Sequence, residues 1–292
     1  MPTTHTSTLA PPDAALPRAA FIRRAWWPTP ALGATALLHA AGTGALIYEP
    51  LAWPWIAGGL LANHAVLAAA GFAPRSRLIG PNIARLPSAA AERREVALTF
   101  DDGPDPDVTP RVLDLLDAAG MKASFFLIGE RAACHPQLVR EIVERGHAAE
   151  NHSYRHAAGF AFYGIGKALR DVDQAQRAIA DGAGSAPLYF RAPFGIRSPL
   201  LEPALVAAGL RYVSWTRRGL DTVDRNAEKV VGRLARGLAA GDVLLLHDGA
   251  VRRTSADDTA VLPTLRTLLA RLAERGLKSV TLRAACADAQ GG

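Results

Sequence analysis

Cysteine is scarce in this sequence of 292 residues, which contains only Cys134 and Cys286, far apart in segments with helical periodicity. This excludes a disulfide framework and a CxxC metal site. Runs of Lys or Arg with interleaved aromatic residues are also lacking, so no nucleic-acid groove is expected. The formal net charge of +6 comes largely from scattered arginines and favours anionic surfaces, such as phospholipid head groups or phosphorylated substrates.

Charged residues are absent from two long stretches near the N-terminus, residues 31–48 and 51–73. About 20 apolar residues suffice to cross a bilayer as a helix, so the two stretches predict a transmembrane helical hairpin. Aromatic residues flank both stretches, as at a bilayer interface: Trp26, Trp27, Tyr48, Trp53 and Trp55. We therefore expect a disordered tail over residues 1–25, a membrane hairpin over 26–75 and a linker over 76–94.

The apolar stretches admit two other interpretations. A secretory signal peptide fits poorly, because the polar region before the first stretch is long and a second apolar stretch follows. A buried hairpin of a soluble protein is the other alternative, since both stretches are rich in Ala and Gly and contain His39, Asn63 and His64.

Arginines flank the hairpin on its outer sides only, with none in the loop between the spans: Arg18, Arg23, Arg24, Arg75, Arg77 and Arg85. The positive-inside rule then places both ends in the cytoplasm. We expect a multi-pass protein of a bacterial-type inner membrane with its catalytic domain on the cytoplasmic face.

From residue 95 onward, short apolar runs alternate with helical patterns. Strands are expected at residues 96–100, 123–128, 147–151, 188–191, 212–215, 243–247 and 279–282. Helices are expected at residues 109–119, 136–145, 167–180, 199–208, 227–239 and 262–275. This α/β alternation predicts parallel strands with crossover helices, and seven units favour a barrel over an open sheet.

Polar motifs follow several of these strands, at the edge where barrels of parallel strands carry their active sites. They read TFDDGP at residues 99–104, HSYRH at 152–156, RAPFG at 191–195 and LLH at 245–247, with Asp221 in a further loop. His152 and His156 are four residues apart, and a carboxylate from another strand would complete the three protein ligands of a mononuclear metal site. The histidine pair alone is weak evidence for a metal site. Its position after a strand, together with the other motifs at the ends of other strands, makes the prediction much stronger.

These five segments resemble, in order, the motifs of the polysaccharide deacetylases, the NodB-like carbohydrate esterase family 4. The resemblance implies a NodB homology domain over residues 95–285, a tail over 286–292, and a distorted (β/α)7 TIM-like barrel. It also implies a divalent cation, usually Zn²⁺ and sometimes Co²⁺ or Ni²⁺, and removal of an acyl group from a sugar amine.

By this resemblance Asp102, His152 and His156 are metal ligands, Asp101 is the base that activates water, and His247 is the general acid. A backbone N–H near Phe194 would stabilise the oxyanion.

The resemblance also assigns supporting roles. Arg191 would orient Asp101, Asp221 would pair with His247, and Leu245 would line the acyl-methyl pocket. The alternatives are a structural ion pair for Arg191 and a loop cap for Asp221.

The fourth motif departs from the family pattern Asp-x-x-Asp-Trp, since the chain reads Arg218-Gly219-Leu220-Asp221-Thr222. We expect Trp215 to supply the missing apolar wall. Arg217 and Arg218 are predicted to contact a substrate phosphate at the pocket mouth, and a solvated basic loop is the alternative.

The sequence thus predicts a membrane-bound deacetylase or deformylase of an N-acylated amino sugar, with a lipid-linked envelope glycan as substrate and the membrane as partner. One alternative is an exported deacetylase of peptidoglycan or exopolysaccharide. Another is a catalytically silent glycan-binding barrel, which predicts loss of an acid, base or metal ligand that this sequence retains.

Overall fold

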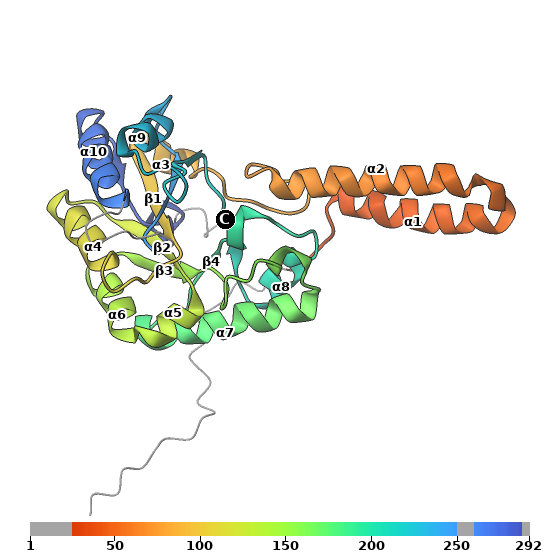
Figure 1. Ribbon diagram of the computed structural model, residues 1–292, viewed down its shortest axis with the longest axis horizontal. Helices are drawn as coiled ribbons and strands as arrows, with labels where there is room; N and C mark the ends of the chain where they lie inside the picture. The colour runs from red at the N-terminus through yellow and green to blue at the C-terminus, as the bar shows by residue number, and fades with distance from the viewer. Residues whose placement is uncertain (1–24, 250–259, 288–292) are drawn as a thin grey trace, which may run out of the picture.

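The computed structural model describes residues 25–249 and 260–287, and in it a long helical hairpin projects from one side of an α/β barrel (Figure 1). All of the predicted N-terminal tail except residue 25 lies outside the described residues. So does most of the predicted C-terminal tail.

The hairpin consists of α1 (Pro30–Tyr48) and α2 (Trp53–Phe72), joined by the short helix η1 (Pro50–Ala52). Proline begins α1 and η1, where its missing N–H costs no hydrogen bond. Both helices are long and apolar enough to cross a membrane, and only 6% and 17% of their most apolar windows are buried. A core helix of a soluble domain would be mostly buried, so this exposure argues against the soluble alternative.

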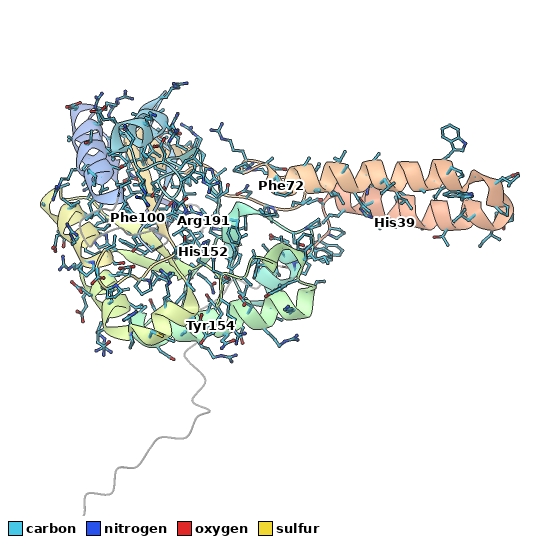
Figure 2. All side chains as sticks on the ribbon, viewed as in Figure 1. His39, Phe72, Phe100, His152, Tyr154 and Arg191 are labelled. Atoms are coloured by element: carbon cyan, nitrogen blue, oxygen red, sulfur yellow. The ribbon has the colours of Figure 1, made fainter. Side chains whose placement is uncertain are left out.

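Polar side chains within the hairpin pair with one another between its helices. Thr35 Oγ1 donates to Asn63 Oδ1 at 3.1 Å, and the rings of His39 and His64 lie 5.2 Å apart. His39 lies midway along the hairpin and Phe72 at its barrel end (Figure 2). The contact with Thr35 satisfies Asn63 Oδ1, whereas Asn63 Nδ2 has no hydrogen-bond partner among the described residues.

The barrel is built on one sheet whose strands all pair in parallel, in the order β5-β4-β3-β2-β1-β7-β6, with β8 paired to the start of β1. Its strands are β1 (Glu95–Asp101), β2 (Ala123–Leu127), β3 (Ala148–Asn151), β4 (Tyr189–Phe190), β5 (Arg211–Tyr212), β6 (Arg217–Arg218), β7 (Val243–His247) and β8 (Lys278–Ser279). The parallel α/β barrel is thus confirmed, with β6 as an unpredicted strand. Within the described residues β5 and β6 are not paired, so the barrel is incomplete.

Helices cover the outside of the sheet at the six predicted places: α4 (Thr109–Ala118), α6 (Pro136–Glu144), α7 (Ile165–Ala183), α8 (Leu201–Ala207), α9 (Ala227–Ala235) and α10 (Val261–Glu274). Three further short helices were not predicted from the sequence: α3 (Ser88–Glu92), α5 (Gly129–Cys134) and α11 (Leu282–Ala285). The predicted strand 279–282 is wrong at its end, because Thr281 caps α11 by accepting from the Ala284 N–H.

Strand β1 is buried on both faces and sets the direction of the catalytic side chains. Leu98 and Phe100 pack toward the helices with residues of α4 and α10, whereas Ala97 belongs to the cluster inside the barrel. Because side chains alternate along a strand, Thr99 and Asp101 also point inward. The inward direction of Thr99 and Asp101 thus follows from the hydrophobic pattern of this strand.

Residues 76–94 fill the gap in the sheet instead of forming a free linker. The Ile83 N–H donates to the Tyr212 carbonyl at 3.1 Å, and the Leu86 N–H to the Gly241 carbonyl at 2.8 Å. Ile79, Leu86 and Ala90 are buried. This segment therefore belongs to the folded barrel, which corrects the expectation of a linker.

The base of the hairpin is fixed to the loop between β4 and α8. In that loop the Arg197 N–H donates to the Gly71 carbonyl at the end of α2, at 3.0 Å. The buried Arg197 guanidinium donates to the Gly80 carbonyl at 2.9 Å and to Glu202 at 2.5 Å. One arginine thus joins the hairpin, the segment that follows it and α8.

Glu202→Gln should destabilise the protein, because it leaves the buried Arg197 charge uncompensated. We expect a loss of about 3 kcal/mol in the free energy of unfolding, measured by urea denaturation of the full chain in detergent. The same substitution at the exposed Glu228 is the control and should change this free energy by less than about 0.5 kcal/mol. Equal effects of the two substitutions would contradict the structural importance of the pair.

Candidate metal centre and active site

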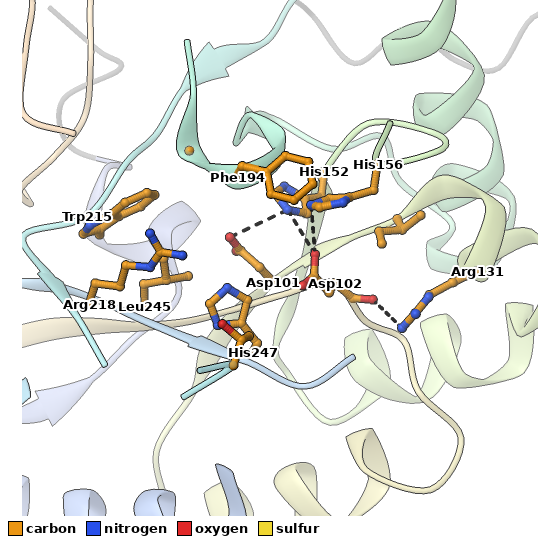
Figure 3. Close-up of a pocket in the computed structure, with 13 residues that line it drawn as sticks. Asp101, Asp102, Arg131, His152, His156, Phe194, Trp215, Arg218, Leu245 and His247 are labelled. Atoms are coloured by element: carbon orange, nitrogen blue, oxygen red, sulfur yellow. Dashed lines mark hydrogen bonds and ion pairs between the residues drawn. The ribbon is translucent and has the colours of Figure 1, made fainter. Parts of the chain in front are cut away.

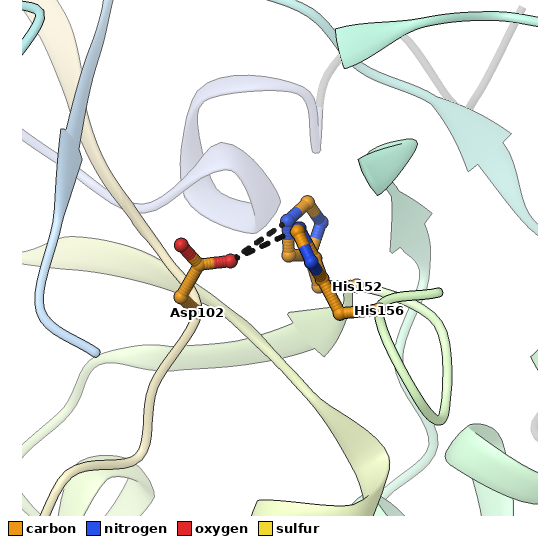
Figure 4. A group of neighbouring side chains, drawn as sticks. All are labelled: Asp102, His152 and His156. Atoms are coloured by element: carbon orange, nitrogen blue, oxygen red, sulfur yellow. Dashed lines mark ion pairs between the residues drawn. The ribbon is translucent and has the colours of Figure 1, made fainter. Parts of the chain in front are cut away.

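Three side chains that could bind a metal ion converge at the carboxyl ends of β1 and β3. Asp102 Oδ1 lies 3.3 Å from His152 Nε2 and 3.2 Å from His156 Nε2 (Figure 4). Ligand atoms of the three residues all lie within 4.8 Å of one another. Two imidazole nitrogens and one carboxylate are a donor set that suits Zn²⁺ or Co²⁺. The predicted ligands are thus brought together.

The surroundings of the cluster fit a cation. Asp102 Oδ1 is buried and accepts no hydrogen bond among the described residues, which is costly unless a cation is bound there. Burial opposes ionisation of Asp102, but the close approach and charge of the His152 imidazole and the charges of His247 and His156 hold its pKa well below the usual range. His152 Nδ1 lies 2.9 Å from the Arg191 carbonyl, which fixes the ring and directs Nε2 into the site.

Asp101 faces the same space and is oriented by Arg191, as the resemblance implied. Arg191 donates to Asp101 Oδ1 at 2.6 Å and to Thr99 Oγ1 at 2.9 Å. The other carboxylate oxygen, Oδ2, lies 3.8 Å from His152 Nε2 and is directed toward the metal ligands (Figure 3). One oxygen of Asp101 is therefore anchored, and the other is placed to accept a proton.

His247 and Asp221 form a second buried pair across the pocket. Asp221 Oδ1 lies 2.9 Å from His247 Nδ1, and its Oδ2 accepts the His247 backbone N–H at 2.7 Å. Burial disfavours the charged imidazole, but the hydrogen bond and charge of Asp221, together with Asp101 and Asp102, raise the pKa of His247. Asp221 thus holds a proton on Nδ1 and favours the imidazolium form, in which the second proton is on Nε2.

The pocket around these residues has a volume of about 250 Å³. Its apolar walls include Leu245, Trp215 and Phe194, whose ring centroid lies 4.6 Å from that of His156. Gly195 has a positive φ of 73°, and an added Cβ there would lie 2.1 Å from the Trp215 ring. Glycine therefore allows Trp215 to form the wall, which supports its predicted position.

The two arginines of β6 point in different directions, which corrects one prediction. Arg218 lines the pocket with its guanidinium 5.4 Å from the Trp215 ring, as expected. Arg217 lies outside the pocket, where its Nε binds the buried Asp242 at 2.5 Å. Adjacent strand residues face opposite sides of a sheet, so the two cannot share one ligand. Arg217 therefore forms a structural ion pair with Asp242.

Arg131 and Thr222 are among the residues that line the pocket but were not predicted as site residues from the sequence. Arg131, on the unpredicted α5, donates to the carbonyls of Asp102 at 2.9 Å and Gly249 at 2.7 Å. It supports the backbone of Asp102, which has a positive φ of 72°. Thr222 lines the pocket next to Asp221, at the place where the family motif has tryptophan. No local sequence pattern predicts that Arg131 belongs to the site. Thr222 could have been found, because it replaces the tryptophan at the end of the fourth family motif.

Asp102→Asn should weaken metal binding at least about tenfold, since changing even outer-shell partners of a metal site costs that much. The measurement is the zinc or cobalt retained per chain after dialysis, by elemental mass spectrometry, with Asp107→Asn on the exposed surface as control. Full retention by Asp102→Asn would remove Asp102 from the ligand set.

Known proteins share both sequence and fold with this chain. A family model described as polysaccharide deacetylase matches residues 88–213. A peptidoglycan-N-acetylglucosamine deacetylase of Bacillus cereus is 32% identical over 189 residues, which cover 64% of this chain and 85% of that protein. A chitooligosaccharide deacetylase of Bradyrhizobium is 35% identical over 179 residues, covering 60% and 81%.

Two solved structures extend the comparison. One is a peptidoglycan N-acetylglucosamine deacetylase with a TM-score of 0.62 and 28% identity, covering 70% of this chain and 92% of that one. The other is a family 4 acetyl xylan esterase of Clostridium thermocellum in complex with a cobalt ion, with a TM-score of 0.59 and 30% identity, covering 66% and 90%. Sequence and fold agree that this chain belongs to the polysaccharide deacetylase family and is a hydrolase of amide bonds.

Proposed function

We propose that the chain removes the N-acetyl group from an N-acetylglucosamine-type sugar within a glycan, using Asp101 as base and His247 as acid. The observation that supports this most directly is the presence of two separately tuned pairs, Asp101 with Arg191 and His247 with Asp221, around one candidate metal cluster. The relatives named as peptidoglycan and chitooligosaccharide deacetylases support the substrate class. Loss of formyl instead of acetyl is the alternative within the same chemistry.

A divalent cation bound by Asp102, His152 and His156 would polarise the acyl carbonyl and make water a stronger acid. Asp101 would take the proton of the attacking water on Oδ2, while Arg191 holds Oδ1. Leu245 and Trp215 would enclose the acyl methyl group and exclude other water. The backbone N–H near Phe194 would donate to the developing oxyanion.

His247 would give its proton to the leaving amine from Nε2. A charged imidazole is needed for this step, and the pairing with Asp221 favours that form. Asp101 thus accepts a proton, because an ionised carboxylate is an acceptor only. His247 donates a proton to the same substrate, because its pairing with Asp221 favours the protonated form.

We further propose that the hairpin anchors the enzyme in a membrane and that the glycan is attached to a lipid. The two apolar helices support the anchor, and Arg218 in the pocket offers a cation for a phosphate near the sugar. Tethering would raise the local concentration of such a substrate. An exported enzyme acting on peptidoglycan is the alternative, and it requires the opposite orientation from the one predicted by the flanking arginines.

Asp101→Asn should lower deacetylation by about 10²-fold or more, because the amide cannot accept the proton of water. The measurement is release of acetyl groups from chitotetraose by the full chain in detergent with added Zn²⁺ or Co²⁺, followed by mass spectrometry. Asp107→Asn should match the unaltered protein. Undiminished turnover by Asp101→Asn would require another base, whereas no release by the unaltered protein would exclude this substrate.

Asp221→Asn should move the alkaline limb of the pH–rate profile to lower pH. The pKa of His247 is raised in the folded protein, so the acid form persists until pH rises through that raised value, and loss of Asp221 lowers it. The measurement is kcat against pH at saturating metal, with Asp224→Asn as control. A limb that does not move would show that His247 is not the titrating acid.

A further inference from the structure

Among the described residues of the barrel, most of the exposed large apolar side chains lie near the carboxyl ends of the strands. Within the described residues from 76 onward, those exposed are Leu78, Phe162, Ile165, Phe194, Leu200, Leu220 and Val223. Leu78 follows α2, five of the others lie between the end of a strand and the start of the next long helix, and Ile165 is the first residue of α7. Between β1 and the end of the described residues, no side chain of this class is exposed between a helix and the following strand.

This distribution places the exposed apolar groups around the pocket. Connections that leave the carboxyl ends of parallel strands gather at the active-site end of a barrel. Phe194 links the two features, because it lines the pocket and is still 51% exposed. Phe162 is 91% exposed, although exposing such a large apolar side chain to water costs free energy.

Four of these residues also lie on the side from which the hairpin projects, and we call them the apolar rim: Leu78, Phe162, Ile165 and Leu200. Leu200 is in the loop whose Arg197 N–H binds Gly71 of α2, and the Leu78 carbonyl accepts from Thr29, the cap of α1.

The other two rim residues lie beside the start of α7, which is also on the hairpin side. Ala168 and Val172 of α7 share a hydrophobic cluster with Leu201 and Leu205 of α8. The far end of α7 packs on α6 instead, since Gly182 lies against Val139. In Figure 1, α8 lies toward the hairpin and α6 away from it. The start of α7 therefore faces the same side as the base of the hairpin.

We infer that the apolar rim rests in the surface of the bilayer that holds the hairpin, so that the catalytic pocket opens at the level of the lipid head groups. The inference depends on the proposed membrane anchor. Continuity with the exposed apolar surface of α1 and α2 favours lipid over a protein partner. Basic and aromatic groups accompany the rim as they do at bilayer interfaces: the Lys167 ammonium lies 3.8 Å from the Tyr163 ring centroid.

A consequence concerns the substrate. A pocket at head-group level receives a glycan whose lipid remains in the bilayer, without extraction of the lipid into water. This deepens the proposed function, since it assigns the carrier of the sugar to the membrane and the approach of the sugar to the rim side.

Spin labels on the full chain test the inference in nanodiscs of phosphatidylcholine and phosphatidylglycerol. Nitroxides are attached at Phe162→Cys and Leu200→Cys in a Cys134→Ser background, since Cys286 is buried. Two positions serve as references: Leu61→Cys on the exposed face of α2, and Lys278→Cys at the opposite end of the barrel. Relaxation by dissolved oxygen reports lipid, and relaxation by a water-soluble nickel chelate reports water.

We expect relaxation by oxygen to exceed relaxation by the nickel chelate for labels at positions 162, 200 and 61. At position 278 we expect the nickel chelate to relax the label more strongly. Nickel dominance at Phe162 and Leu200 with oxygen dominance at Leu61 would overturn the rim contact and leave the anchor intact. Protection of the rim labels from both reagents would indicate a protein contact and would also overturn it. Nickel dominance at Leu61 would overturn the anchor and the inference together. Chitotetraose turnover by the labelled chains tests the chemistry separately.

Discussion

The buried guanidinium of Arg191 is the interaction on which the candidate site depends. It donates to Asp101, Thr99 and the Ser214 carbonyl, and it lies 4.1 Å from the Phe126 ring centroid. The backbone carbonyl of the same residue faces His152 Nδ1. One fully buried arginine therefore positions the base, a metal ligand and the inner wall of the barrel.

Burying a charge this deeply is costly unless it is paired and hydrogen-bonded, and among the described residues Nε is the one nitrogen of this guanidinium without a hydrogen-bond partner. Carboxylate, hydroxyl, carbonyl and aromatic face surround Arg191 from β1, β2 and the chain after β5. The strands that carry these groups must keep their register, because a shift of one residue would turn Thr99 and Asp101 to the helix side. The ion pair and the hydrophobic pattern of β1 thus select the same arrangement.

Much of this arrangement was predictable from the sequence, because the chemistry lies in short motifs directly after well-marked strands. Strand β7 has the predicted bounds, and Asp102, His152 and His156 converge as predicted. Arg217 was assigned wrongly, since the pattern did not show that β6 is a strand whose adjacent side chains diverge. Arg131 and the 76–94 segment were missed for a related reason: their partners, Gly249 and Tyr212, are more than a hundred residues away.

The loop between β4 and α8 performs two tasks within a few residues. Phe194 and Gly195 shape the pocket, and Arg197 binds the end of α2 and the segment after it. Truncating the chain before residue 76 to obtain a soluble enzyme would therefore do more than remove an anchor. It would strip Leu67 and Ala70 from Ile79 and take away a partner of the loop that carries the pocket wall. The hairpin thus supports, through Gly71, the same loop that carries Phe194 and Gly195 of the pocket wall.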